Sequence, residues 1–159
     1  GRERRGTGRG AGEDSRMGKK ELEQKMLDSA TRSKIVDELF DVYETRRPLR
    51  RLTGTYPGLT VEDSYLVQEE FVRRKVDAGA KVKGYKVGLT SKPMQEMAGS
   101  SEPDFSAITD DMFLPEATPI DASRFFRPMI EIEIAFVMKH ALKGPGVLPV
   151  DVIRATDFV

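Results

Sequence analysis

The stretch Arg127-Pro-Met-Ile-Glu-Ile-Glu-Ile-Ala-Phe-Val-Met-Lys139 alternates along its length with the period of a β-strand. Successive side chains of a strand point to opposite faces. Neighbouring side chains on the same face lie about 6.5–7 Å apart. One face would carry Ile130, Ile132, Ile134, Phe136 and Met138, and the other Glu131, Glu133, Ala135 and Val137. The stretch therefore predicts a strand with two neighbouring carboxylates on one face.

Two carboxylates at this spacing are predicted to bind a divalent cation. Burying both without a counter-charge would be costly. Hard oxygen ligands suit Mg²⁺ or Mn²⁺. The alternative is an amphipathic strand whose glutamates face water, as charged side chains mostly do. The alternation by itself leaves both interpretations open.

Composition narrows the class of protein. The 159 residues are enough for one domain, and acidic and basic residues balance, so no overall basic field would recruit nucleic acid. The absence of cysteine excludes a disulfide framework, a thiolate nucleophile and a cysteine zinc site. We see neither an apolar run of membrane-spanning length nor a signal peptide, so we expect a cytoplasmic protein with no membrane partner.

The two ends of the chain are unusual. Residues 1–16 contain five glycines and five arginines and bury little, so we expect a disordered leader, non-native or unprocessed, before Met17. The last residues, Asp157-Phe158-Val159, belong to a segment of increasing apolar content that contains neither a turn signal nor a helix cap. We therefore expect the chain to be truncated at its C-terminus.

Residues 17–81 are predicted to form a helical region. A helical period runs from Lys19 to Arg46, with a break near Asp28-Ser29, and Pro48 follows its end. Residues 50–59 read as a loop with a turn at Tyr56-Pro57-Gly58. Thr60 is a predicted N-cap, and the second helix would end near Gly79 with Val61, Tyr65, Gln68 and Val72 on its packed face. The two helices are expected to pack on each other.

Strand patterns follow from Val82. Residues 82–90 predict a strand in which Gly84 and Gly88 flank Lys86, and such glycines usually admit a close backbone or ligand. A short helix is expected over 93–97, a polar loop over 99–104, and irregular structure over 105–114 with a short strand near Met112. Residues 149–155 predict another short helix, and a strand starts at Thr156.

Three features could carry chemistry: Lys86, Asp104 and the pair Glu131 and Glu133. A metal could chelate a 2-oxo acid through its carboxylate and keto oxygens, while a lysine near a carboxylate moves a proton. Each feature alone is weak evidence for an active site, because single lysines are usually solvated and an aspartate after proline usually belongs to a turn. The absence of cysteine rules out a Cys-His arrangement, and the single histidine gives no support for a Ser-His-Asp arrangement.

Several motifs together resemble one family. They are Gly84-Tyr-Lys-Val-Gly-Leu-Thr-Ser-Lys-Pro-Met-Gln95, Glu102-Pro-Asp-Phe105, Asp110-Asp-Met-Phe113, Arg127-Pro-Met-Ile-Glu-Ile-Glu-Ile-Ala-Phe-Val137, Leu142-Lys-Gly-Pro-Gly146 and Asp151-Val-Ile-Arg-Ala-Thr-Asp-Phe-Val159. In this order and spacing they resemble the hydratase/decarboxylase branch of the fumarylacetoacetate hydrolase superfamily, from about Ile35 to the last residue.

The resemblance implies a fold and a site. The fold would be α+β, with N-terminal helices followed by the first part of a mixed β-sandwich or roll, which residues 82–159 begin. A divalent metal would be held by Glu131, Glu133 and a third acid that the family places beyond Val159. Lys86 and Asp104 would be the proton-handling pair. The full-length enzyme would be a homo-oligomer.

The function implied is a metal-dependent hydratase, a hydro-lyase. It would add water to a 2-oxo-alkenoate, formed from a 2-hydroxydienoate, to give a 4-hydroxy-2-oxo acid in the catabolism of aromatic compounds. The first alternative is a decarboxylase of the same branch, of the 4-oxalocrotonate type. The second is an inactive fragment or non-catalytic partner subunit, since the chain by itself would lack the third acid.

Overall fold

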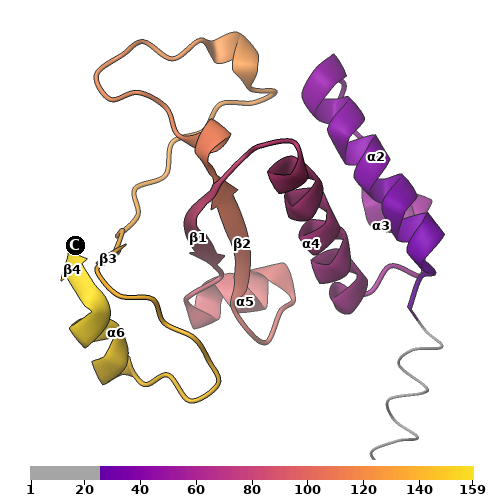
Figure 1. The fold of residues 1–159 in the computed structure, drawn as a ribbon. Coiled ribbons are helices and arrows are strands. Elements are labelled where there is room, and N and C mark those ends of the chain that lie inside the picture. Colours follow the sequence, from indigo (N-terminus) through magenta and orange to yellow (C-terminus); the bar gives the residue numbers. More distant parts are fainter. Residues whose placement is uncertain (1–25) are drawn as a thin grey trace, which may run out of the picture. The chain divides into compact units, whose positions relative to one another are not determined.

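The computed structural model describes residues 26–159 and shows a mixture of helices and strands (Figure 1). The leader predicted over 1–16 and the start of the first predicted helix lie outside the described residues. The chain divides into two compact units, with the division between Asp121 and Ala122. The presence of both helices and strands confirms the α+β class.

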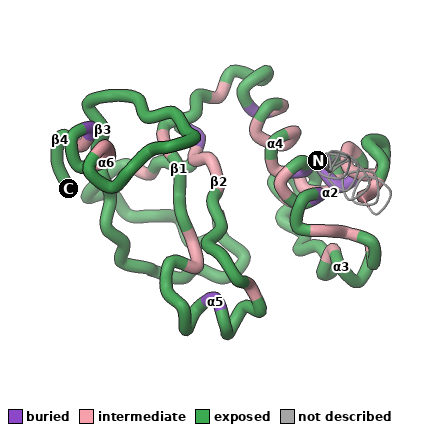
Figure 2. The backbone as a smooth tube through the Cα atoms, turned by 90° about the horizontal axis from the view of Figure 1, so that it is seen from below, coloured by how far each residue is buried: buried purple, intermediate pink, exposed green. Residues whose placement is uncertain are grey.

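Helix α2 runs from Ser29 to Thr45 and begins at the predicted break. Asp28 caps it, because its carboxylate accepts from Thr31 N at 2.8 Å. Arg46 ends the helix in the left-handed conformation, with φ 56°, and its N–H donates to the Val42 carbonyl. Ile35 and Val36 are fully buried on the inner face of α2, where the core of the first unit lies (Figure 2).

The loop predicted over 50–59 is partly wrong, because Leu52–Thr55 forms the short helix α3. Leu52 packs against the Ile35 and Val36 core, and this tertiary contact favours a helical turn that the local sequence does not indicate. The turn at Tyr56-Pro57-Gly58 is confirmed. The Tyr56 hydroxyl donates to Glu38 Oε1 at 2.6 Å and ties this turn to α2.

Helix α4, Val61–Asp77, has the predicted capping box, in which Thr60 and Asp63 bond each other's backbone N–H. Gly79 follows its end with φ 107°. The two helices pack on each other as predicted, with the rings of Phe40 and Phe71 4.6 Å apart.

The packed face predicted for α4 is only partly confirmed. Val61 is 63% exposed, whereas Val67 is buried against α2. Tyr65 and Gln68 instead contact the neighbouring strand β2: the Tyr65 ring stacks on Phe105, and Gln68 Nε2 donates to the Phe105 carbonyl at 3.1 Å. The helix therefore packs on two sides, and a single apolar stripe does not describe it.

Strand β1, Val82–Gly88, is confirmed and pairs antiparallel with β2, Asp104–Thr109. The sequence predicted loop and irregular structure over most of β2, and this was wrong because pairing with β1 decides the conformation there. The strand predicted near Met112 is instead a 3₁₀ turn, η1, Asp110–Met112. Helix α5, Lys92–Ala98, connects the two strands and matches the short helix predicted over 93–97.

The second unit contains the 3₁₀ turn η2, Ala122–Arg124, strand β3, Val137–Met138, helix α6, Pro149–Ala155, and strand β4, Thr156–Phe158. Helix α6 and the start of β4 agree with the prediction. The long strand predicted over 127–139 is wrong except at Val137–Met138, which pairs with β4. Among the described residues no strand lies beside 128–136, so their backbone has no ladder partner, and Ile130 and Ile132 are 95% and 99% exposed.

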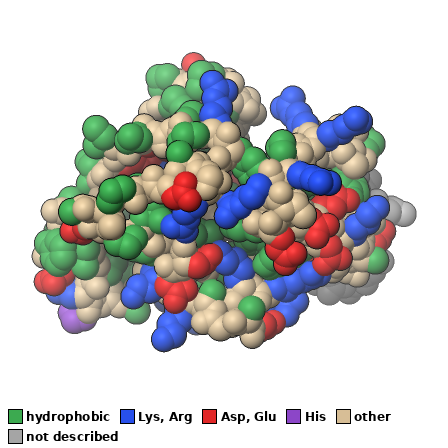
Figure 3. Space-filling view, turned by 90° about the horizontal axis from the view of Figure 1, so that it is seen from above, with side chains coloured by type: hydrophobic (Ala, Val, Ile, Leu, Met, Phe, Trp, Pro, Cys, Tyr) green, Lys and Arg blue, Asp and Glu red, His purple; other side chains and the backbone are tan. Residues whose placement is uncertain are grey.

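Figure 3 shows apolar, basic and acidic side chains exposed on one face of the molecule. No helix in the described part of the chain is both long and apolar enough to cross a membrane.

Candidate active site

Lys86 and Asp104 lie on the same face of the β1–β2 ladder. In the antiparallel register Lys86 is opposite Ser106 and Gly88 is opposite Asp104. Directly paired residues share a face, as do residues two apart along a strand. Lys86 and Asp104 are therefore diagonal neighbours, a relation in which long side chains can reach each other. The structure brings together these two predicted site residues.

Gly88 makes room for the Asp104 carboxylate. A Cβ atom on Gly88 would overlap Asp104 Oδ1 and would also lie 3.3 Å from its Cγ. A Cβ on Gly84 would meet nothing within 4 Å. The close approach predicted for these glycines thus occurs at Gly88, and the approaching group is a side chain of the site.

A pocket of about 710 Å³ opens beside this pair. Its walls come from the N-terminal half of α4, the two strands and the loop that joins α5 to β2. The lining residues are Val61, Glu62, Ser64, Tyr65, Gln68, Lys86, Leu89, Ala98, Gly99, Ser100, Ser101, Glu102, Pro103, Asp104, Phe105 and Ser106. Lys86 is the sole basic residue among these lining residues, and three of them, Glu62, Glu102 and Asp104, carry carboxylates. The volume suits a small organic molecule.

The wall formed by α4 is fixed by a buried carboxylate. Asp63 is fully buried and accepts from Leu27 N with both oxygens at 3.1 Å and from the Thr60 N–H at 3.2 Å. Its Oδ1 also lies 3.3 Å from the Arg32 guanidinium. Burial raises the pKa of Asp63, but these donors lower it more, so the carboxylate stays charged. Asp63 therefore anchors the start of α4 to α2.

Sequence reasoning missed the part of the pocket that α4 provides. The Tyr65 and Phe105 rings, with centroids 5.0 Å apart, form its aromatic wall. The signal available was the alternation over 104–107, which would have placed Phe105 on the face of β2 opposite that of Asp104. Contact with α4 could not be read from it.

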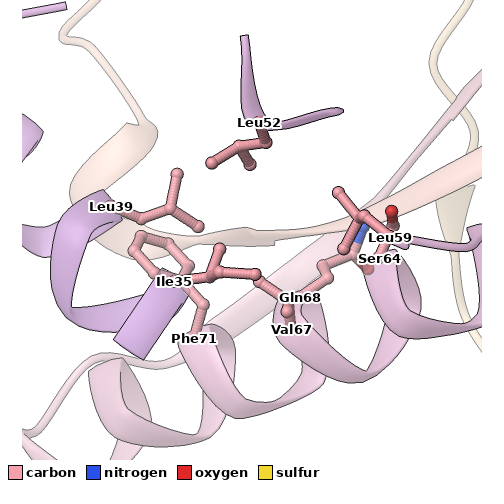
Figure 4. A pocket seen from close by; sticks show the side chains of 8 residues that line it. All are labelled: Ile35, Leu39, Leu52, Leu59, Ser64, Val67, Gln68 and Phe71. Atoms are coloured by element: carbon pink, nitrogen blue, oxygen red, sulfur yellow. The ribbon is translucent and has the colours of Figure 1, made fainter. Parts of the chain in front are cut away.

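A second, smaller pocket is lined by residues of α2, α3 and α4 and shares Ser64 and Gln68 with the first (Figure 4). It has a volume of about 220 Å³, and its lining is almost entirely apolar. The residues around it are Ile35, Leu39, Leu52, Leu59, Ser64, Val67, Gln68 and Phe71. Figure 4 shows Leu52 of α3 on the side opposite Val67 of α4.

Glu131 and Glu133, the predicted metal ligands, belong to the second unit. Both are exposed and lie in the segment without regular secondary structure. Within the described residues no group of three or more His, Asp and Glu side chains is arranged to hold a metal ion. His140 is exposed.

Comparison with known proteins identifies related enzymes. No family model matches the chain. It is 43% identical over 134 residues to a 2-oxo-hept-4-ene-1,7-dioate hydratase of Escherichia coli, covering 84% of this chain and 50% of that one. It is 38% identical over 135 residues to a 2-hydroxypent-2,4-dienoate hydratase of Pseudomonas putida, covering 84% and 60%. A 4-oxalocrotonate decarboxylase of P. putida is 39% identical over 111 residues, covering 70% and 42%.

The fold agrees with these relatives. A solved structure of 4-oxalocrotonate decarboxylase from P. putida G7, complexed with magnesium and adipate, superposes with a TM-score of 0.78 at 32% identity. The match covers 83% of this chain and 50% of that one. The chain spans about half the length of the curated relatives it matches. The resemblance read from the motifs is thereby confirmed: over the matched length, the chain is similar to these hydratases and decarboxylases.

Proposed function

We propose that this chain forms the proton-handling part of a metal-dependent hydratase of 2-oxo-alkenoates, a cytoplasmic enzyme of aromatic-compound catabolism. The observation that carries the proposal is the placement of Lys86 and Asp104 as diagonal neighbours in one pocket. Curated hydratases at 34–43% identity support the reaction class. The proposed substrate is a 2-hydroxydienoate and the product a 4-hydroxy-2-oxo acid.

Lys86 and Asp104 would perform the proton transfers of this reaction. Ketonisation moves a proton from the 2-hydroxyl oxygen to carbon, and hydration then adds water to the remaining double bond. A carboxylate can accept the first proton and an ammonium group can deliver one, provided that both reach the substrate. The aromatic wall of Tyr65 and Phe105 would contact the hydrocarbon chain.

Glu131 and Glu133 would hold the metal together with the third acid that the family places beyond Val159. Their oxygen donors fit Mg²⁺ or Mn²⁺, and two carboxylates leave most of such a coordination shell to other ligands. When bound, the metal would stabilise negative charge on the carboxylate and keto oxygens of the substrate. Magnesium in the related decarboxylase supports this choice of ion.

We further propose the organisation that accompanies this function. Residues 17–81 would form the helical region and residues 82–159 the start of a β-sandwich or roll, completed by a segment beyond Val159. The enzyme would be a homo-oligomer, as the family resemblance implies.

The decarboxylase is the second candidate, and the 39% identity to a 4-oxalocrotonate decarboxylase supports it about as well as the hydratase identities support the first. The two are separated by incubating the chain, extended through the third acid, with 2-hydroxyhexa-2,4-dienedioate and Mg²⁺. A hydratase yields a 4-hydroxy-2-oxo diacid without gas, whereas a decarboxylase releases carbon dioxide. Neither product from a folded, metal-loaded protein would favour the non-catalytic partner subunit.

A further inference from the structure

Leu89 adopts a conformation that its side chain disfavours. Its φ is 52°, in the left-handed region, where the Cβ of a non-glycine residue crowds the backbone. Leu89 follows directly after β1, three residues from Lys86, and lines the proposed substrate pocket. Strained backbone of this kind persists only where surrounding contacts hold it.

The contact that holds Leu89 is a buried amide. Gln95 of α5 is only 5% exposed, and its Nε2 donates to the Leu89 carbonyl at 2.8 Å. Its Oε1 accepts from Lys92 Nζ at 3.0 Å, so the amide has partners on both sides. A buried polar side chain whose groups are bonded in this way has a defined orientation.

The backbone of Gln95 supports a second part of the same wall. Its carbonyl oxygen accepts from the Ser100 N–H at 2.9 Å, and Gly99 caps α5 in the left-handed conformation with a bond to the same oxygen. Gly99 and Ser100 also line the pocket. One residue thus bonds both the segment that follows Lys86 and the segment that precedes Asp104.

We propose that Gln95 is a positioning residue, which holds Leu89 in its left-handed conformation and thereby fixes the pocket wall between Lys86 and Asp104. The inference rests on the proposed function in one respect, namely that this pocket is the one that binds the substrate. Gln95 itself does not line the pocket and would act through Leu89.

A double-mutant cycle tests this role, because glycine takes a positive φ without the Cβ penalty. Gln95→Met removes both amide bonds at similar volume. In the Leu89 background of the chain extended through the third acid, we expect it to weaken the binding of adipate with Mg²⁺ about five- to tenfold, the effect of one lost hydrogen bond. In the Leu89→Gly background we expect a loss of less than about twofold. Equal losses in both backgrounds would overturn the inference.

Two further variants isolate the bond to Leu89. Gln95→Glu keeps the acceptor for Lys92 but loses the donor to Leu89, so it should behave like Gln95→Met and replaces it if that variant does not fold. Lys92→Met leaves the Leu89 bond intact and should keep wild-type affinity.

The backbone conformation of residue 89 is read directly by NMR scalar couplings that report φ. We expect a positive φ in the wild type and Lys92→Met, and a shift to negative φ in Gln95→Met and Gln95→Glu. An unchanged φ in both Gln95 variants would contradict the positioning role. Failure of the wild type to bind adipate would instead contradict the proposed function, so the two failures are distinguishable.

Discussion

Gly88 and Asp104 face each other across the β1–β2 ladder, and the carboxylate of Asp104 occupies the space where a Cβ of residue 88 would stand. The missing side chain of Gly88 therefore lets a carboxylate of the candidate site lie close to the strand that carries Lys86. Gly84, at the other side of Lys86, has no such neighbour. The two glycines that flank Lys86 differ in role although the sequence makes them look equivalent.

Gly88→Ala should displace Asp104 and lower turnover by about 10²-fold, the cost of misplacing a catalytic group by roughly 1 Å. Gly84→Ala is the matched control on the same strand. It should leave turnover unchanged and raise the free energy of unfolding by about 0.4–1 kcal/mol, because the unfolded chain loses freedom. Steady-state kinetics and urea unfolding of both variants check this, and equal activities would show that the position of Asp104 does not matter.

The local signals of the sequence predicted local structure well. The capping box of Thr60 and Asp63, the left-handed Gly79 and the α6 helix all depend on residues within a few positions of each other. Strand β2 was missed because its conformation depends on β1, about twenty residues earlier.

The alternating glutamate stretch shows the opposite error. Its period is that of a strand. A period shows only which side chains would share a face, whereas a strand also requires a partner for its backbone hydrogen bonds. The described residues supply a partner only at Val137–Met138. The proximity of Lys86 and Asp104 was expected from the family resemblance, whereas the contribution of α4 to their pocket needed the tertiary structure.

Asp63→Asn should destabilise the first unit by roughly 3 kcal/mol. The new amide group turns N–H donors toward the N–H of Leu27 and the Arg32 guanidinium, all in a buried site. Asp28→Asn is the matched control, because Asp28 is exposed and asparagine caps helices equally well. Thermal unfolding should show a lowered Tm for the first variant and an unchanged Tm for the second. Equal Tm values for the two variants would show that Asp63 does not anchor α4.

The ion pair between Lys75 and Asp111 should make stability depend on pH. Lys75 is 8% exposed, and its Nζ lies 2.7 Å from Asp111 Oδ2, which lowers the pKa of Asp111. Because the folded pKa lies below the unfolded value of about 3.9, the pair stabilises the fold above that pH and loses its effect as pH falls through the folded pKa.

Asp111→Asn should therefore cost about 1–2 kcal/mol at pH 7, a modest value because half of the Asp111 side chain is exposed. The difference from wild type should shrink as the pH falls below about 3.9 and through the folded pKa of Asp111, because the wild type then loses the charge as well. Urea unfolding between pH 2 and 7 measures it, and a difference independent of pH would show that the ion pair is not its source.

Glu131→Gln should weaken Mg²⁺ binding by at least about tenfold in the chain extended through the third acid, since a neutral amide is a poorer ligand for a hard cation. Glu116→Gln, an exposed acidic residue of the first unit, is the control and should keep wild-type affinity. Calorimetric titration decides this. Identical metal affinities for both variants and the wild type would exclude Glu131 as a ligand.

The kinetics of Lys86→Met in the same extended chain, at saturating Mg²⁺, test the central claim most directly. Lys83→Met is the matched control, because Lys83 is exposed on the same strand but does not line the pocket. If Lys86 transfers protons beside Asp104, its loss should lower kcat about 10²–10⁴-fold while metal affinity stays unchanged, and Lys83→Met should remain fully active. Full activity of Lys86→Met would contradict the account and remove this lysine from the site.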